Sequence, residues 1–176
     1  MATPPVFTPG AVLTAAQMNQ VGLWLVKTET IGSGVTSVVV SDAFSADFDN
    51  YLIQATGGVT SATVTVTMAL GGSTTGYYSG ATIVTYATGA VTGVAANNAA
   101  AWNVGLATTG LINVAVTVMG PNLTDPTTYQ SFDSNTTSQA RNWVGYHSPA
   151  TAYTSFTLAG GTFTGGTIRV YGYNPG

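Results

Sequence analysis

The stretch that decides the fold is Ala62-Thr63-Val64-Thr65-Val66-Thr67-Met68-Ala69-Leu70, in which larger apolar residues alternate with threonine and alanine. Residues two apart in a strand point to the same face. The alternation therefore predicts a strand with one face in a core and a second face covered mainly by threonine. Valine and threonine are β-branched and suit this pleated, half-buried setting.

Much of the remaining chain consists of similar short segments separated by Gly, Ser, Thr and Asn. Such segments, with no helical period between them, predict an all-β fold built from antiparallel sheets. Residues 87–100 and 133–139 are small or polar and are expected to form long loops, which favours a jelly-roll-like β-sandwich over an up-and-down barrel. Further strands are expected over 23–30, 35–40, 51–55, 77–86, 101–106, 111–119, 127–132, 142–147, 153–158 and 167–173.

One helical pattern stands near the N-terminus. Thr14-Ala15-Ala16-Gln17 matches a capping box, and Leu13 and Met18 have the spacing of a hydrophobic staple. The short helix is expected to end near Val21-Gly22 and would be marginal unless it packed on its own domain or on a partner. We therefore divide the chain into an anchor segment, residues 1–22, and a β-sandwich domain, residues 23–176.

The low content of charged residues bears on which partners the protein can have. Charged residues make up 5% of the chain, with three basic and six acidic side chains, against about 25% in ordinary soluble domains. Three scattered cations argue against a nucleic-acid partner, because phosphate binding needs several. Low charge also removes a barrier to association between copies, so we expect an oligomer. A monomer with a surface rich in Ser, Thr and Asn is the alternative.

Cysteine and targeting signals are missing from the sequence. Without cysteine, neither a disulfide framework nor a thiolate metal site can form. The first residues lack the basic and apolar parts of a secretory signal, and no apolar run reaches about 18 residues, so we expect no membrane insertion. Synthesis in the cytoplasm of a host is the expectation.

Enzymatic chemistry has little support in the sequence. His147 is the one histidine, and we interpret it as a hydrogen-bonded surface residue beside a turn. The pairs Asp47 with Asp49 and Asp125 with Asp133 are the available carboxylate pairs for a glycosidase. The run 47–50 offers oxygens to calcium, but turn formation explains it better. Gly71-Gly72 and Gly160-Gly161 are expected to be turns, since neither leads into a helix with lysine. We predict no catalytic residue, metal or cofactor.

Aromatic residues near strand ends and loops are the best candidates for receptor binding, because their rings suit sugars and protein interfaces. For each of them, a place in the core or at a subunit interface is the alternative. Trp24 is assigned to packing. The receptor-binding candidates are Tyr77, Tyr78, Trp102, Tyr129, Trp143 and Tyr146.

Four stretches stand out at the two ends and in the first third of the chain. They are Phe7-Thr8-Pro9-Gly10-Ala11-Val12-Leu13-Thr14-Ala15-Ala16-Gln17-Met18-Asn19, Gly22-Leu23-Trp24-Leu25-Val26-Lys27, Phe48-Asp49-Asn50-Tyr51 and the C-terminal run 165–174. Together they resemble tailed-bacteriophage virion proteins of the tail-fibre, head-fibre and receptor-binding types known from aquatic phages. The middle of the chain does not take part in this resemblance. The resemblance implies a surface-exposed virion protein, often a homotrimer, whose N-terminal segment docks on the particle.

From these observations we hypothesise a structural phage protein, a projecting fibre or spike that oligomerises and binds a host-surface glycan or protein. Residues 1–22 would contact other virion proteins, with Phe7, Val12, Leu13 and Met18 as the anchoring side chains. A capsid decoration or cement protein that stabilises the head is the alternative. A carbohydrate-active enzyme is a third hypothesis, and the least favoured.

Overall fold

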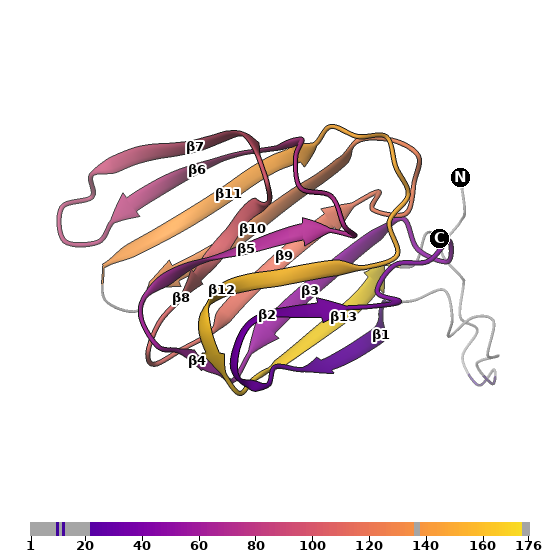
Figure 1. The fold of residues 1–176 in the computed structure, drawn as a ribbon, viewed down its shortest axis with the longest axis horizontal. Helices are drawn as coiled ribbons and strands as arrows, with labels where there is room; N and C mark the ends of the chain where they lie inside the picture. The colour runs from indigo at the N-terminus through magenta and orange to yellow at the C-terminus, as the bar shows by residue number, and fades with distance from the viewer. Residues whose placement is uncertain (1–9, 11, 13–21, 136–137, 174–176) are drawn as a thin grey trace.

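The computed structural model describes Gly10, Val12, residues 22–135 and residues 138–173 (Figure 1). The helix predicted over 14–21 and the anchoring residues Phe7, Leu13 and Met18 lie outside the described residues. Val12 is described and is exposed. Within the described ranges the regular structure consists of strands, and no helix is long and apolar enough to cross a membrane.

The described residues form thirteen strands in antiparallel sheets, which confirms the predicted all-β class. The strand that contains most of the 62–70 alternation runs over Val64–Leu70. In chain order the strands are β1 (Leu23–Thr30), β2 (Ser33–Val40), β3 (Asn50–Thr56), β4 (Val59–Thr60), β5 (Val64–Leu70), β6 (Tyr77–Thr85), β7 (Val91–Ala99), β8 (Trp102–Ala107), β9 (Asn113–Met119), β10 (Thr127–Asn135), β11 (Gln139–His147), β12 (Phe156–Thr164) and β13 (Thr167–Tyr173).

Two sheets of unequal width face one another (Figure 1). The wide sheet has the order β1-β13-β3-β9-β10-β11-β6-β7, and the narrow sheet has the order β2-β12-β5-β8, with β4 added beside β12. Most strand pairings join opposite halves of the chain, and four of them are nested within one another: β1 with β13, β2 with β12, β3 with β9 and β5 with β8. The first half of the chain therefore lies along the second half through both sheets.

The core fills the space between these two sheets. Alternate residues of β3 and β9, such as Ile53 and Val116, face Met68 and Leu70 of β5 and Phe156 of β12, and all five are almost completely buried. A buried side chain of this size contributes about 1.5–3 kcal/mol to stability. Val66, Met68 and Leu70 are buried, as the alternation predicted, whereas Val64 is partly buried.

Four strands extend the wide sheet on the far side of β9, and their inward-facing residues, such as Tyr77, Tyr129 and Trp143, belong to the same core. The four strands are β10, β11, β6 and β7, which lie side by side between β9 and one edge of the sheet. The β6–β7 hairpin is inserted between β5 and β8 of the narrow sheet, and the β10–β11 hairpin between β9 and β12. We call these four strands the extension, and we call the face of the wide sheet that points away from the narrow sheet its outer face.

The prediction of long loops over 87–100 and 133–139 was wrong. Residues 91–99 form β7, and most of 133–139 belongs to the ends of β10 and β11. β7 could not be predicted because most of its residues are exposed. Such a strand needs no apolar face, so its sequence does not alternate between apolar and polar residues. Gly89, with a φ of 66°, closes the β6–β7 turn through its amide to the carbonyl of Thr85.

The prediction of a turn at Gly160-Gly161 was also wrong, because both glycines lie inside β12. A Cβ atom on Gly160 would lie 2.9 Å from the ring of Phe163. The β2–β12 register shifts between Ala159 and Phe163. The two glycines therefore make room for a bulge that buries Phe163, which is a common use of glycine within a strand.

Candidate functional site

The extension carries two shallow hollows. The first, of about 290 Å³, is lined by Asn113, Ala115, Phe132, Asp133, Ser134, Ala140 and Arg141. The second, of about 240 Å³, is lined by Tyr78, Ser79, Gly80, Ala96, Val144, Gly145 and Tyr146. Most residues that line the first hollow occupy strand positions that alternate with buried positions. In the second hollow, such positions are held by Tyr78, Gly80, Val144 and Tyr146. Both hollows therefore open on the outer face.

Two tyrosines from neighbouring strands meet at the second hollow. Tyr78 of β6 lies opposite Tyr146 of β11, and their rings stack with centroids 4.8 Å apart and planes 7° from parallel. Tyr146 is 43% exposed. The sequence had proposed both residues for receptor binding, and the structure brings them together as one aromatic platform.

Gly145 allows β11 and β6 to approach closely beneath this platform. A Cβ atom at Gly145 would lie 2.1 Å from the carbonyl oxygen of Tyr78 and 2.8 Å from the ring of Tyr129. Any other residue would therefore push β11 away from β6 or from the ring below. The tyrosine pair depends on a glycine between Val144 and Tyr146.

Phe132 and Val144 continue the apolar surface, and neither was among the candidates from the sequence. Phe132 is 60% exposed and lies opposite Asn142, two residues from Val144, which is 51% exposed. The available signal was the alternation of β10, which turns Tyr129 and Ser131 inward and so turns Phe132 outward. We call Tyr78, Phe132, Val144 and Tyr146 the aromatic strip.

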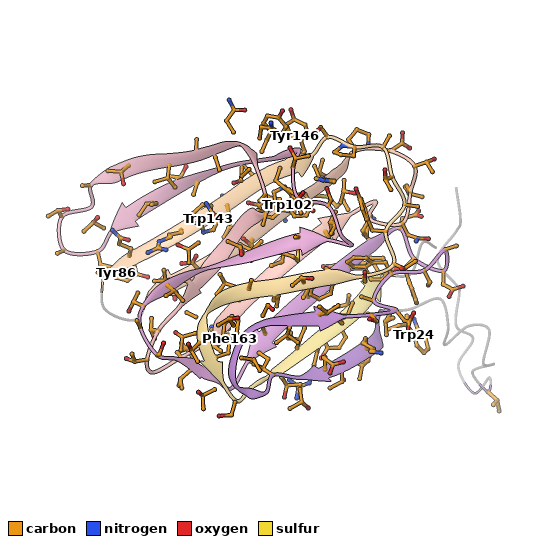
Figure 2. All side chains as sticks on the ribbon, viewed as in Figure 1. Trp24, Tyr86, Trp102, Trp143, Tyr146 and Phe163 are labelled. Atoms are coloured by element: carbon orange, nitrogen blue, oxygen red, sulfur yellow. The ribbon has the colours of Figure 1, made fainter. Side chains whose placement is uncertain are left out.

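The other four receptor-binding candidates lie in the core. Tyr77, Trp102, Tyr129 and Trp143 are each at most 4% exposed. Two of them link the extension to β8 of the narrow sheet: the indole N–H of Trp102 donates to the carbonyl of Tyr146 at 3.0 Å, and the Tyr129 hydroxyl donates to the carbonyl of Asn103 at 2.6 Å. These residues are buried and support the aromatic strip from the inner side. Trp102 and Trp143 are labelled in Figure 2.

A buried polar cluster lies on the inner side of the first hollow. The indole N–H of Trp143 donates to Oδ2 of Asp133, and Arg141 Nε lies 3.9 Å from Oδ1 of the same carboxylate. Arg141 also donates to the side chain of Gln139. Burial raises the pKa of Asp133, while the contacts with Trp143 and Arg141 partly oppose that rise.

His147 lies in the core, so its interpretation as a surface residue was wrong. Its Nε2 lies 2.9 Å from Ser73 Oγ and 3.1 Å from the carbonyl oxygen of Thr75. A carbonyl only accepts, so we assign the proton to Nε2. Nε2 then presents a donor to Ser73, so it has no lone pair with which to deprotonate that hydroxyl. The remaining lone pair of the neutral ring is on Nδ1, which is buried without a hydrogen-bond partner. Burial lowers the pKa of His147.

The acidic residues considered for catalysis or calcium lie in ordinary settings. Asp47 is exposed and accepts from the hydroxyl of Ser45 two residues before it, as in a local turn. Asp125 is exposed, whereas Asp133 is buried beneath the extension. In the part of the chain that the structure describes, no three His, Asp or Glu side chains form a group suited to a metal ion.

Trp24, which the sequence assigned to packing, is 38% exposed on β1 (Figure 2). It lies opposite Gly172, whose position is closely covered by the ring of Phe48.

No protein family, curated protein or solved structure matches the chain. The candidate site therefore stands on the geometry of the extension.

Proposed function

We propose that the protein is a structural component of a tailed-bacteriophage particle, a projecting fibre or spike that self-associates and binds the host surface. The N-terminal segment would dock on other virion proteins, and the extension would face the host. The protein would act without enzymatic chemistry, as a virion-surface component synthesised in the host cytoplasm. The resemblance at both ends of the sequence supports this role.

The observation that carries the proposal is the separation of the two ends of the wide sheet. β1, which follows the proposed anchor, is one edge strand, and β7 of the extension is the other. Seven strand spacings of about 4.8 Å separate them by roughly 34 Å along the sheet. Figure 1 places the β6–β7 hairpin at the opposite end of the molecule from β1. An anchor and a recognition surface would need such a separation.

We infer further that the strand order is that of a jelly roll. The four nested pairings between the halves of the chain give β1-β13-β3-β9 in one sheet and β2-β12-β5-β8 in the other. That arrangement is an eight-stranded roll, to which β4 and the extension are added. Jelly rolls serve viral capsid and lectin domains among others, so the fold is compatible with the proposed role but does not select it.

Low charge supports self-association, and the resemblance implies a homotrimer. The sequence has no charged residue between Asp49 and Asp125, a range that includes β7. The edge strand β1, by contrast, carries Lys27, Glu29 and a register shift after Leu25, all of which discourage pairing with another chain. β7 is therefore the edge at which we expect copies to meet.

Deletion of residues 1–22 tests the proposal. The truncated protein should keep its sheets, because β1 begins at Leu23, and should remain oligomeric but fail to join particles in a complementation assay. Normal incorporation of the truncated protein would contradict the anchor. Electron microscopy of particles carrying the labelled full chain separates a projecting fibre from a decoration protein spread over the head.

A further inference from the structure

We propose that the outer face of the extension binds a neutral, extended carbohydrate chain along the aromatic strip. The inference rests on the proposed role in host recognition and names the ligand class and the surface. Its starting observation is that both hollows lie on one face, with Phe132 beside the first and the Tyr78–Tyr146 pair beside the second.

The chemistry of this surface fits sugar rings. Tyr146, Phe132 and Val144 expose aromatic and apolar surface, which packs against the C–H faces of a sugar. Polar side chains on the same face surround the strip and supply hydroxyls and amides for the sugar hydroxyls. These are Asn113, Thr128, Gln130, Ser134 and Asn142, all exposed.

The ligand should be uncharged because the surface offers no charged group to it. Asp133 and Arg141 line the first hollow, but their side chains are only 1% and 11% exposed and face each other on the inner side. The remaining lining residues of both hollows are uncharged. Phosphate, sulfate or uronic acid groups would find no exposed cation to replace their hydration.

The spacing of the two hollows favours a chain over a single ring. On β11, Asn142 lies opposite Phe132 beside the first hollow, and Tyr146 lies beside the second. Four residue steps along the strand separate them, which is about 14 Å at a rise of roughly 3.4 Å per residue. One sugar ring cannot contact both, whereas an oligosaccharide can.

An extended peptide fits the surface less well. Peptides that add to a sheet pair with the free backbone of an edge strand. The strip lies on β10, β11 and β6, each paired on both sides, so its backbone groups are already bonded within the sheet. Recognition there must come from side chains, which suits a ligand built from rings and hydroxyls.

Binding of the purified full-length protein to an oligosaccharide array tests the inference. The array carries neutral chains of glucose, galactose, mannose and N-acetylglucosamine in increasing length, with uronic acid and sialic acid chains beside them. We expect binding to one or more neutral chains that strengthens with length. Tyr146→Ala and Phe132→Ser should each weaken that binding by about tenfold or more, as truncation of a central aromatic usually does.

Tyr86→Ala is the matched control, since Tyr86 is a tyrosine with 51% exposure that belongs to neither hollow. Figure 2 shows it at the far end of the extension from Tyr146. Equal losses in Tyr146→Ala and Tyr86→Ala would overturn the inference. So would binding to the acidic chains alone, or binding to a host-surface protein with no response to any glycan. Particle incorporation of these variants reports separately on the proposed function.

Discussion

The indole N–H of Trp143 donates a 2.9 Å hydrogen bond to Oδ2 of Asp133, and both side chains are buried beneath the extension. Trp143 on β11 and Asp133 on β10 thus join the two strands of one hairpin on the inner face. The bond matters because a buried carboxylate without donors is costly. It links the polar cluster to the strands that hold the aromatic strip.

Replacement Trp143→Phe should lower the free energy of unfolding by about 1–3 kcal/mol, because it removes the donor and leaves a buried acceptor underused. Urea denaturation followed by circular dichroism measures the change. Trp24→Phe is the control: Trp24 is 38% exposed at the β1 edge, and its replacement should change stability by no more than about 0.5 kcal/mol. Equal losses in the two variants would show that the bond to Asp133 contributes nothing particular.

Asp133 should make stability depend on pH in the opposite sense to an ordinary ion-paired carboxylate. Burial raises its pKa in the folded protein above the value of the unfolded chain. On acidification the folded state therefore binds the proton first, so protonation favours folding. The contribution of Asp133 is fully present below the unfolded pKa and is lost as pH rises through the folded pKa.

Comparison with Asp133→Asn isolates this effect, because other groups, including His147, titrate in both proteins. Urea denaturation between neutral pH and about pH 4 should show the parent protein gaining stability relative to Asp133→Asn as the pH falls. A parent protein that loses stability relative to the variant over that range would mean that Arg141 and Trp143 outweigh burial.

The core strands could be predicted from the sequence, whereas the candidate site was predicted in part. Alternation identified Val66, Met68 and Leu70 because their burial repeats with period two. The adjacent Tyr77 and Tyr78 show the limit. Successive strand residues face opposite sides, so one ring lies in the core and the other on the outer face. Which is which follows from the β6–β11 register, and a single sequence does not contain it.

Phe132 and β7 were missed for a related reason. An aromatic residue in a strand is more often buried than exposed, whereas Phe132 faces outward because the wide sheet has no layer on its outer face among the described residues. β7 owes its strand conformation to pairing with β6, which offers a free edge. Neither the uncovered face nor the free edge can be read from local propensity.

Gly145→Ala should strongly destabilise the protein and disturb the tyrosine pair. The new methyl group would overlap the Tyr78 carbonyl and the Tyr129 ring, so we expect a loss of about 3 kcal/mol or more in the free energy of unfolding. Gly72→Ala is the matched control, because nothing lies within 4 Å of a Cβ atom there. Thermal unfolding of both variants distinguishes the two sites, and a tolerated Gly145→Ala would contradict the close approach of β11 and β6.

Self-association through β7 can be tested by placing a charge on that edge. Val94 is 43% exposed on β7, and a lysine there should repel its counterpart on a neighbouring copy and shift the protein toward monomer. The parent mass, measured by light scattering after size-exclusion chromatography, reports whether the oligomer is a trimer.

Val39→Lys is the control, because Val39 is 59% exposed on β2, the edge of the narrow sheet. Since a single exposed lysine should leave folding stability within about 0.5 kcal/mol of the parent, a shift in mass reports on the contact. If Val39→Lys dissociates the oligomer and Val94→Lys does not, the copies meet at the narrow sheet instead, and the outer face of the extension stands clear of the interface.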